Sequence, residues 1–223
     1  MKTMYGHSPS DVRRWPDDPA AHRALKEYLQ RISVDPDAER TAELLLVGRG
    51  LDFTGADLSG LDLLAAEFSE STLTGVRLAS ADLYMAWLRS AQLSGADLSS
   101  ADLRKAQGQH CAARNVKMCN ADLQKADFSD SDFRGADLSG ARLQRVTFSG
   151  SDLRGASLRD CTFRTTRFSD ARLADCDVHG AAGLVMGPVD VGVESPHSIG
   201  GQELRSWFVA NGAPDVEVYQ QTQ

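Results

Sequence analysis

Residues 121–140 read ADLQK ADFSD SDFRG ADLSG, four groups of five in which the third residue is Leu or Phe and the first is Ala or Ser. Outward from this stretch the same frame runs without a slip from Leu51 to Gly180 and gives 26 consecutive pentapeptides. Their third positions hold 15 Leu and 7 Phe. An apolar residue at every fifth position therefore organises more than half of the chain.

A period of five excludes ordinary amphipathic elements. An α-helix repeats every 3.6 residues and a strand every 2, so neither would keep the Leu and Phe side chains on one side. The chain must instead turn every five residues. The first positions hold 14 Ala and otherwise mostly Ser, Cys or Val, which indicates a second inward site with little room. Gly, Ser and Asp near the ends of the groups are typical of tight turns.

This A(D/N)LXX pattern resembles the pentapeptide-repeat family over residues 51–180. The resemblance implies an all-β solenoid, a right-handed quadrilateral parallel β-helix with four pentapeptides in each coil. The 26 pentapeptides would then make about 6.5 coils. Each Leu or Phe would stack on the residue 20 positions away, and burial of each would stabilise the coil by about 1.5–3 kcal/mol.

The flanks of the repeat predict α-helical caps for the open ends of the coil. Residues 1–50 are expected to form the N-terminal helical cap. Apolar positions at helical spacing predict an amphipathic helix over 19–32, and Asp35 followed by Pro36 predicts a second helix that runs through AELLLV to Gly48 or Gly50.

Residues 181–223 are expected to form the C-terminal capping or dimerisation segment. In this segment QELRSWFVANG predicts a helix that ends at Gly212, and DVEVY predicts a short strand behind it.

One part of the repeat departs from the pattern. Gly108 and Ala113 stand at third positions, where they interrupt a column of large apolar residues. We expect a local irregularity at residues 106–118. It is either a packing defect filled by neighbours or water, or a loop used in binding. The interrupted column is Phe68, Leu88, Gly108, Phe128, Phe148 and Phe168.

Composition limits the classes of function. The formal net charge of -7 makes generic nucleic-acid binding through phosphate contacts unfavourable. No apolar run approaches the roughly 20 residues that span a bilayer, and the first residues lack the apolar core of a secretory signal. The sequence therefore predicts a cytoplasmic protein with no direct nucleic-acid partner and no membrane partner.

The residues that usually carry chemistry are scattered or inward. Cys111, Cys161 and Cys176 take the small inward position, so we expect them to fill the core, and Cys119 is expected to be partly exposed. The cysteines lack zinc-type spacing, the five histidines lack triad-like partners, and the glycines fall at turns. We therefore expect no catalytic residue, no metal, no cofactor and no enzymatic activity.

Outward positions four pentapeptides apart should align in columns, and one column is acidic. Carboxylates spaced near 5 Å repel unless cations lie beside them. Lys105, Lys125 and Arg145 lie three residues beyond this column on the same face. The column is either a neutralised, solvated face or a partner-binding surface that imitates a line of DNA phosphates. Its residues are Asp62, Asp82, Asp102 and Asp122.

Two further sets of outward residues are candidate contacts. An apolar patch is expected to lie under the N-terminal helices or to serve as a partner or dimer site. A basic column on another face would contact something acidic or pair with neighbouring Asp side chains. The patch is Leu64, Tyr84, Met85 and Trp87. The basic column is Arg114, Arg134 and Arg154.

The family resemblance implies a function. Pentapeptide-repeat proteins include those that confer quinolone resistance or self-protection against gyrase poisons, and these resemble B-form DNA in shape and charge. By this resemblance the chain is a DNA mimic that binds DNA gyrase or topoisomerase IV and protects it from inhibitors. The alternative is a protein-interaction scaffold or regulator unrelated to topoisomerases. Relatives in the resistance group dimerise through their C-terminal ends, so Trp207, Phe208 and Val209 form either a homodimer contact or a seal on the last coil.

Overall fold

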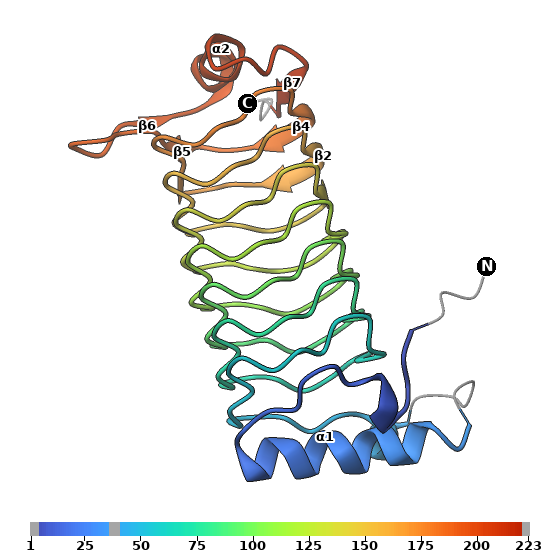
Figure 1. Ribbon diagram of the computed structural model, residues 1–223. Coiled ribbons are helices and arrows are strands. Elements are labelled where there is room, and N and C mark those ends of the chain that lie inside the picture. Colours follow the sequence, from blue (N-terminus) through green and yellow to red (C-terminus); the bar gives the residue numbers. More distant parts are fainter. Residues whose placement is uncertain (1–4, 36–40, 220–223) are drawn as a thin grey trace.

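The computed structural model describes residues 5–35 and 41–219, and most of the second range is a stack of coils (Figure 1). Backbone bridges join residues 20 positions apart in parallel, from Asp52 with Thr72 to Ser157 with Asp177. The pentapeptide frame thus forms the β-helix solenoid with parallel pairing that the repeat predicts.

The five positions of a pentapeptide have distinct roles in the coil. Every third-position residue from Phe53 to Val178 is buried. Backbone hydrogen bonds join successive coils; the amide of Leu63, for example, donates to the carbonyl of Asp82 in the next coil at 2.9 Å. The fifth residue turns the chain with a positive φ, including residues other than Gly such as Lys125 at 63°. This left-handed conformation costs a residue with a side chain about 1–2 kcal/mol, so the turns favour Gly, Asn and Asp.

The backbone irregularity expected at residues 106–118 is wrong, but the interpretation of a space filled by a neighbour is confirmed at Gly108. Gln107 bridges in register with Asp127, and the turn residue His110 has the same positive φ, 61°, as the other corners. A Cβ added to Gly108 would overlap the ring of Phe128. The larger side chain therefore fills the space that the glycine leaves, and the coil closes regularly.

At the N-terminal end, helix α1 (Pro19–Ile32) lies across the first coil (Figure 1). Asp18 starts the helix by accepting a hydrogen bond from the amide of Ala21 at 2.7 Å. Leu25 and Leu29 are fully buried in the same core cluster as the coil. The hydroxyl of Tyr28 donates to the carbonyl of Asp62 at 2.8 Å. The amphipathic face predicted for residues 19–32 thus packs on the coil.

The second predicted helix is wrong over the residues that the structure describes. Pro36 and residues 37–40 lie outside them, and beyond only a 3-10 turn forms, η2 (Ala42–Leu44). Val47 then bridges in parallel with Glu67, and the amide of Gly48 donates to the carbonyl of Glu67 at 2.7 Å. An extended chain satisfies the open edge of the coil, which a helix cannot do. A second 3-10 turn, η1 (Pro9–Asp11), lies nearer the start.

At the C-terminal end the coils contain longer strands. The sheet with the order β1-β2-β4-β7 is parallel throughout. In the sheet with the order β3-β5-β6, β3 and β5 pair in parallel, whereas β5 and β6 pair antiparallel. Helix α2 (Gly201–Ala210) lies at the end opposite α1 (Figure 1), and both the helix and the strand predicted here are confirmed. Of the helices among the described residues, none is long and apolar enough to cross a bilayer. The strands are β1 (Arg142–Gln144), β2 (Thr162–Arg167), β3 (Ala171–Arg172), β4 (Ala182–Met186), β5 (Val189–Asp190), β6 (Ser198–Ile199) and β7 (Val216–Val218).

Candidate binding surfaces

The four aspartates of the acidic column are brought together. Asp62, Asp82, Asp102 and Asp122 are successive parallel bridge partners, and each is half-buried. Each carboxylate also accepts a hydrogen bond from the amide two residues further on, as Asp82 does from Tyr84 at 2.9 Å. The repeat backbone thus fixes where the carboxylates lie.

The charge of this column is uneven. Arg104 donates to both carboxylate oxygens of Asp102, and Arg142 Nη1 lies 3.0 Å from Asp122 Oδ2. Burial, together with the nearby carboxylates of Asp62 and Asp102, raises the pKa of Asp82 to about 6. Negative charge therefore does not run as an uncompensated line along the coils.

The cations that neutralise the column differ from those expected. Lys105, Lys125 and Arg145 make no ion pair within the described part of the chain, and Lys105 Nζ instead donates to the hydroxyl of Tyr84 at 2.6 Å. Arg104 and Arg142 take that role. The sequence does carry a signal for Arg142, because it stands one coil after Asp122 in the same column.

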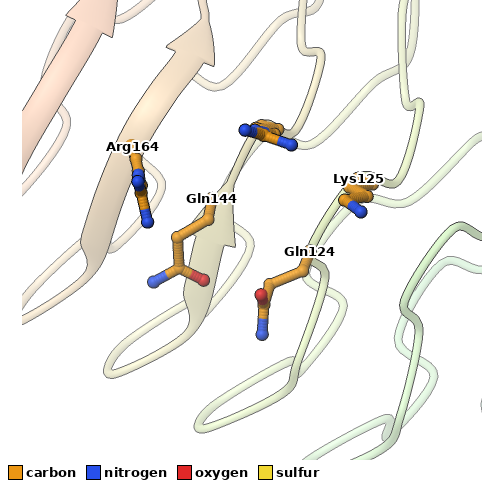
Figure 2. Close-up of a pocket in the computed structure, with 5 residues that line it drawn as sticks. Gln124, Lys125, Gln144 and Arg164 are labelled. Carbon is orange, nitrogen blue, oxygen red and sulfur yellow. The ribbon is translucent and has the colours of Figure 1, made fainter.

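Lys125 and Arg145 instead border a pocket that the sequence reasoning missed. The pocket measures about 190 Å³, and its lining comes from three successive coils (Figure 2). Gln144 and Arg164 are parallel partners between β1 and β2. The amide of Lys125 donates to the carbonyl of Gln144 at 3.0 Å, and that of Arg145 to the carbonyl of Arg164 at 2.9 Å. Reading the fourth and fifth repeat positions at steps of one coil would have revealed it. The lining residues are Gln124, Lys125, Gln144, Arg145 and Arg164.

Among the described residues, α1 does not cover the exposed part of the apolar patch, so the interpretation that the N-terminal helices lie over it is wrong there. Met85 and Trp87 stay 46% and 43% exposed, because α1 lies over the end of the coil and not over its side. Leu64 and Tyr84 are half-buried. The guanidinium of Arg104 lies 5.2 Å from the Tyr84 ring centre. The patch is therefore aromatic with a cationic edge.

The basic column pairs internally with aspartates. The carboxylate of Asp132 forms ion pairs with the guanidinium groups of Arg114 at 2.6 Å and Arg134 at 2.8 Å. That of Asp152 pairs with Arg154 at 2.6 Å. Burial opposes ionisation of Asp152, but hydrogen bonds from Arg154 outweigh it and hold its pKa below the usual value. Of the two interpretations of this column, the structure supports pairing with neighbouring Asp side chains.

The cysteines lie as the sequence indicates. Cys111, Cys161 and Cys176 are buried, and Cys119 is half-buried. Burial raises the pKa of each of the three buried thiols to about 12. Within residues 5–35 and 41–219, His, Cys, Asp and Glu side chains form no group of three that could hold a metal ion.

The three C-terminal candidates differ in exposure. Phe208 is fully buried, with its ring 6.4 Å from that of Phe163 in the last full coil. Trp207 is partly buried against the same core, and Val209 is 46% exposed. Phe208 therefore packs within its own chain and is not available to a second copy.

Comparison with solved structures finds pentapeptide repeat proteins. One from the Arabidopsis thaliana thylakoid lumen is 36% identical over 44% of this chain and 69% of its own, with a TM-score of 0.44. HetL, involved in heterocyst differentiation regulation in the cyanobacterium Nostoc, is 24% identical over 66% of this chain and 88% of its own, with a TM-score of 0.23. QnrB1, a plasmid-mediated fluoroquinolone resistance protein, is 22% identical over 59% of this chain and 77% of its own, with a TM-score of 0.32. Among curated proteins, a sequence search finds no significant match.

The family comparison covers the repeat itself. The model of pentapeptide repeats matches in eight copies, over residues 52–86, 77–107, 114–150 and 141–180. These ranges include more than half of the chain and coincide with the coils in which every fifth residue turns the backbone. The chain belongs to the pentapeptide-repeat family.

Proposed function

We propose that this chain is a non-catalytic binding protein that holds a protein partner against the side of its β-helix, around Tyr84, Met85 and Trp87. The exposure of Met85 and Trp87 carries the proposal, because these large side chains stand on a coil bridged to both neighbours. A rigid aromatic anchor buries much area at little cost in conformational entropy, and Trp and Tyr are enriched among residues that dominate binding energy.

The edge of this surface indicates the chemistry of the partner. Arg89 lies 5.8 Å from the Trp87 ring centre, and Lys105 lies 5.0 Å from that of Tyr84. Because these cations surround the rings, the complementary surface has an apolar centre bordered by carboxylates. Such a partner fits either a topoisomerase subunit or an unrelated protein.

The test immobilises the full-length chain and its Trp87→Ala variant and quantifies the proteins that each retains from an extract of the source cells. A retained partner is then purified, and its affinity for both proteins is measured. Truncation of a central anchor is expected to weaken that affinity at least about tenfold. Val193→Ala, which shortens another exposed apolar side chain, is the matched control and should retain the partner. Equal binding by all three proteins would reject the surface.

DNA mimicry toward a type II topoisomerase is the second candidate. It is supported by Asp62 and Asp82, whose carboxylates lie on adjacent coils as phosphates do along a strand, and by the net charge of -7. The pairing of Asp102 with Arg104 and of Asp122 with Arg142 weakens it.

Titration into supercoiling and quinolone-dependent cleavage assays of DNA gyrase and topoisomerase IV separates the candidates. A DNA mimic inhibits supercoiling or protects against cleavage, and Asp62→Asn with Asp82→Asn reduces that effect while Asp97→Asn on another face does not. Absence of any effect at micromolar protein would exclude mimicry for these enzymes and leave the Trp87 surface untouched.

A further inference from the structure

The pocket of Figure 2 brings together three cations that have no carboxylate partner among the described residues. Lys125 and Arg145 stand at the same corner of successive coils, and Arg164 follows in the coil after them. Coils stack about 4.8 Å apart, so these positive charges repel one another unless an anion lies between them.

The basic column elsewhere shows how this chain handles stacked arginines. There, Asp132 and Asp152 alternate with Arg114, Arg134 and Arg154. At the pocket, the residues between the cations are neutral glutamines.

The carboxylate in the same pentapeptide as Gln124 and Lys125, Asp122, is already engaged. Arg142 lies 3.0 Å from it, Arg104 lies 4.0 Å from it, and the Nε2 of Gln124 donates to it at 3.0 Å. The positive charge of the pocket is therefore left uncompensated.

The amide of Gln144 lines the pocket and has one unpaired end. Its Oε1 is buried and has no hydrogen-bond donor in the described chain, while its Nε2 donates to Thr162 Oγ1 at 2.7 Å. Figure 2 shows this oxygen turned toward Gln124. The two ends of a glutamine amide can exchange by rotation. After rotation Thr162 donates to Oε1, and Nε2 takes the buried position beside Gln124 in the wall of the pocket.

We propose that this pocket is an anion site that binds the phosphate group of a phosphomonoester. A phosphomonoester carries close to two negative charges near pH 7, and arginine forks bind phosphate oxygens in pairs. About 190 Å³ admits one tetrahedral group and the first atoms of its ester. The net charge of -7 opposes a long polyanion such as nucleic acid. The site shares no residue with the Trp87 surface, so it stands independently of the proposed function.

The backbone offers variants that remove a cation without disturbing the fold. Lys125 and Arg145 have φ of 63° and 59°, a region that Gly prefers and that Gly135 and Gly140 occupy at other corners. Lys125→Gly and Arg145→Gly should therefore fold at least as stably as the wild type. Lys125→Gln provides a second removal of charge that keeps the side-chain length. Lys117→Gln, which removes an exposed cation from another face, is the matched control.

The experiment is calorimetric titration of the full-length chain with inorganic phosphate and with a hexapeptide that contains one phosphoserine, at matched ionic strength. Both probes are expected to bind the wild type and Lys117→Gln, and each pocket variant is expected to weaken binding about tenfold. Tighter binding of the peptide would identify the source as a phosphorylated protein. Equal binding would identify free phosphate or a small phosphomonoester.

Three results would overturn the site. One is no binding of either probe up to about 10 mM. Another is equal weakening by Lys117→Gln, which would mean that only diffuse charge is sensed. The last is that duplex DNA binds more tightly than the phosphopeptide and that this binding depends steeply on salt. The surface around the pocket would then be a nucleic-acid surface.

Discussion

The ring of Phe128 occupies the space that Gly108 leaves in the preceding coil, and a Cβ on Gly108 would overlap this ring. Phe128 in turn stacks on Phe148 with ring centres 6.3 Å apart. Gly108 and Phe128, one coil apart, thus share one volume of the core. The side-chain volume that one of these positions can hold therefore depends on the side chain at the other.

Gly108→Ala should therefore destabilise the chain by overpacking, by about 1–3 kcal/mol in the free energy of unfolding measured with urea. The double variant Gly108→Ala with Phe128→Leu should lose less than the sum of the two single variants, because the smaller side chain leaves room for the added methyl group. Additive losses would show that the two side chains do not compete for space.

Asp82→Asn should stabilise the chain near neutral pH. With a pKa raised from 3.8 to about 6, the folded state keeps a proton that the unfolded state has lost. The free energy of unfolding therefore falls as pH rises from about 4 to about 6 and stays lowered above that window. The asparagine keeps the acceptor for the Tyr84 amide and removes the charge. We expect a gain of about 1 kcal/mol at pH 7, after allowance for solvent screening.

Chemical denaturation across this pH range measures the effect. The variant should lose the decline in stability between about pH 4 and 6 that the wild type shows. Asp52→Asn is a control of opposite sign, because a hydrogen bond from Thr54 lowers the pKa of Asp52 and favours its charged form. A variant less stable than the wild type at pH 7 would contradict the burial of Asp82 as a charged group.

Asp152→Ala should destabilise the chain by about 1–2 kcal/mol, because Arg154, Arg134 and Arg172 lie 2.6–3.9 Å from its carboxylate. Asp177→Ala removes a more exposed carboxylate that pairs with Arg159 and should cost less than about 0.5 kcal/mol. The pKa of Asp152 is lowered, so its contribution is present above the unfolded value of 3.8 and is lost on acidification below it. Thermal melts at low and high salt measure this. The loss of stability caused by Asp152→Ala should become smaller as the salt concentration rises, because salt screens the ion pairs. Equal losses for the two variants would contradict the network.

Phe208→Ala should cost about 3–5 kcal/mol in the free energy of unfolding, because it removes a fully buried ring from the C-terminal end. Val209→Ala should change stability little, since Val209 is exposed. Light scattering of the same variants addresses a homodimer through this end. Loss of a dimer in Val209→Ala without loss of stability would support a dimer contact there, and an unchanged monomer in both would reject it.

The fold followed from the sequence wherever one position repeats. The Leu and Phe at third positions predicted the coil, and the step of four pentapeptides placed Asp62 beside Asp82. The AELLLV stretch misled because its apolar residues suit a helix, yet the open edge at Glu67 pairs with an extended Val47. Local propensity lost to a tertiary hydrogen-bonding demand.

The candidate surfaces were harder to predict, because the repeat fixes backbone positions and leaves side-chain directions free. Arg104 folds back on Asp102 in its own pentapeptide, while its neighbour Lys105 donates to Tyr84 in the preceding coil. The five-residue repeat gives no signal that these two cations have different partners. The pairing of each depends on which acceptor lies within reach of a flexible side chain. The register of the coils aligns Lys125, Arg145 and Arg164, but only the structure shows that these cations lack carboxylate partners among the described residues.

The parallel step of four pentapeptides also makes the chain modular in length. Removal of residues 101–120 would join Ser100 to Ala121, set Phe128 under Leu88 and Asp122 under Asp82, and shorten every column by one residue while keeping it on its own face. Removal of half a coil would instead turn all later coils by half a revolution and put each column on the opposite face. Duplication or loss of whole coils can therefore lengthen or shorten this rod during evolution while each binding face is inherited intact.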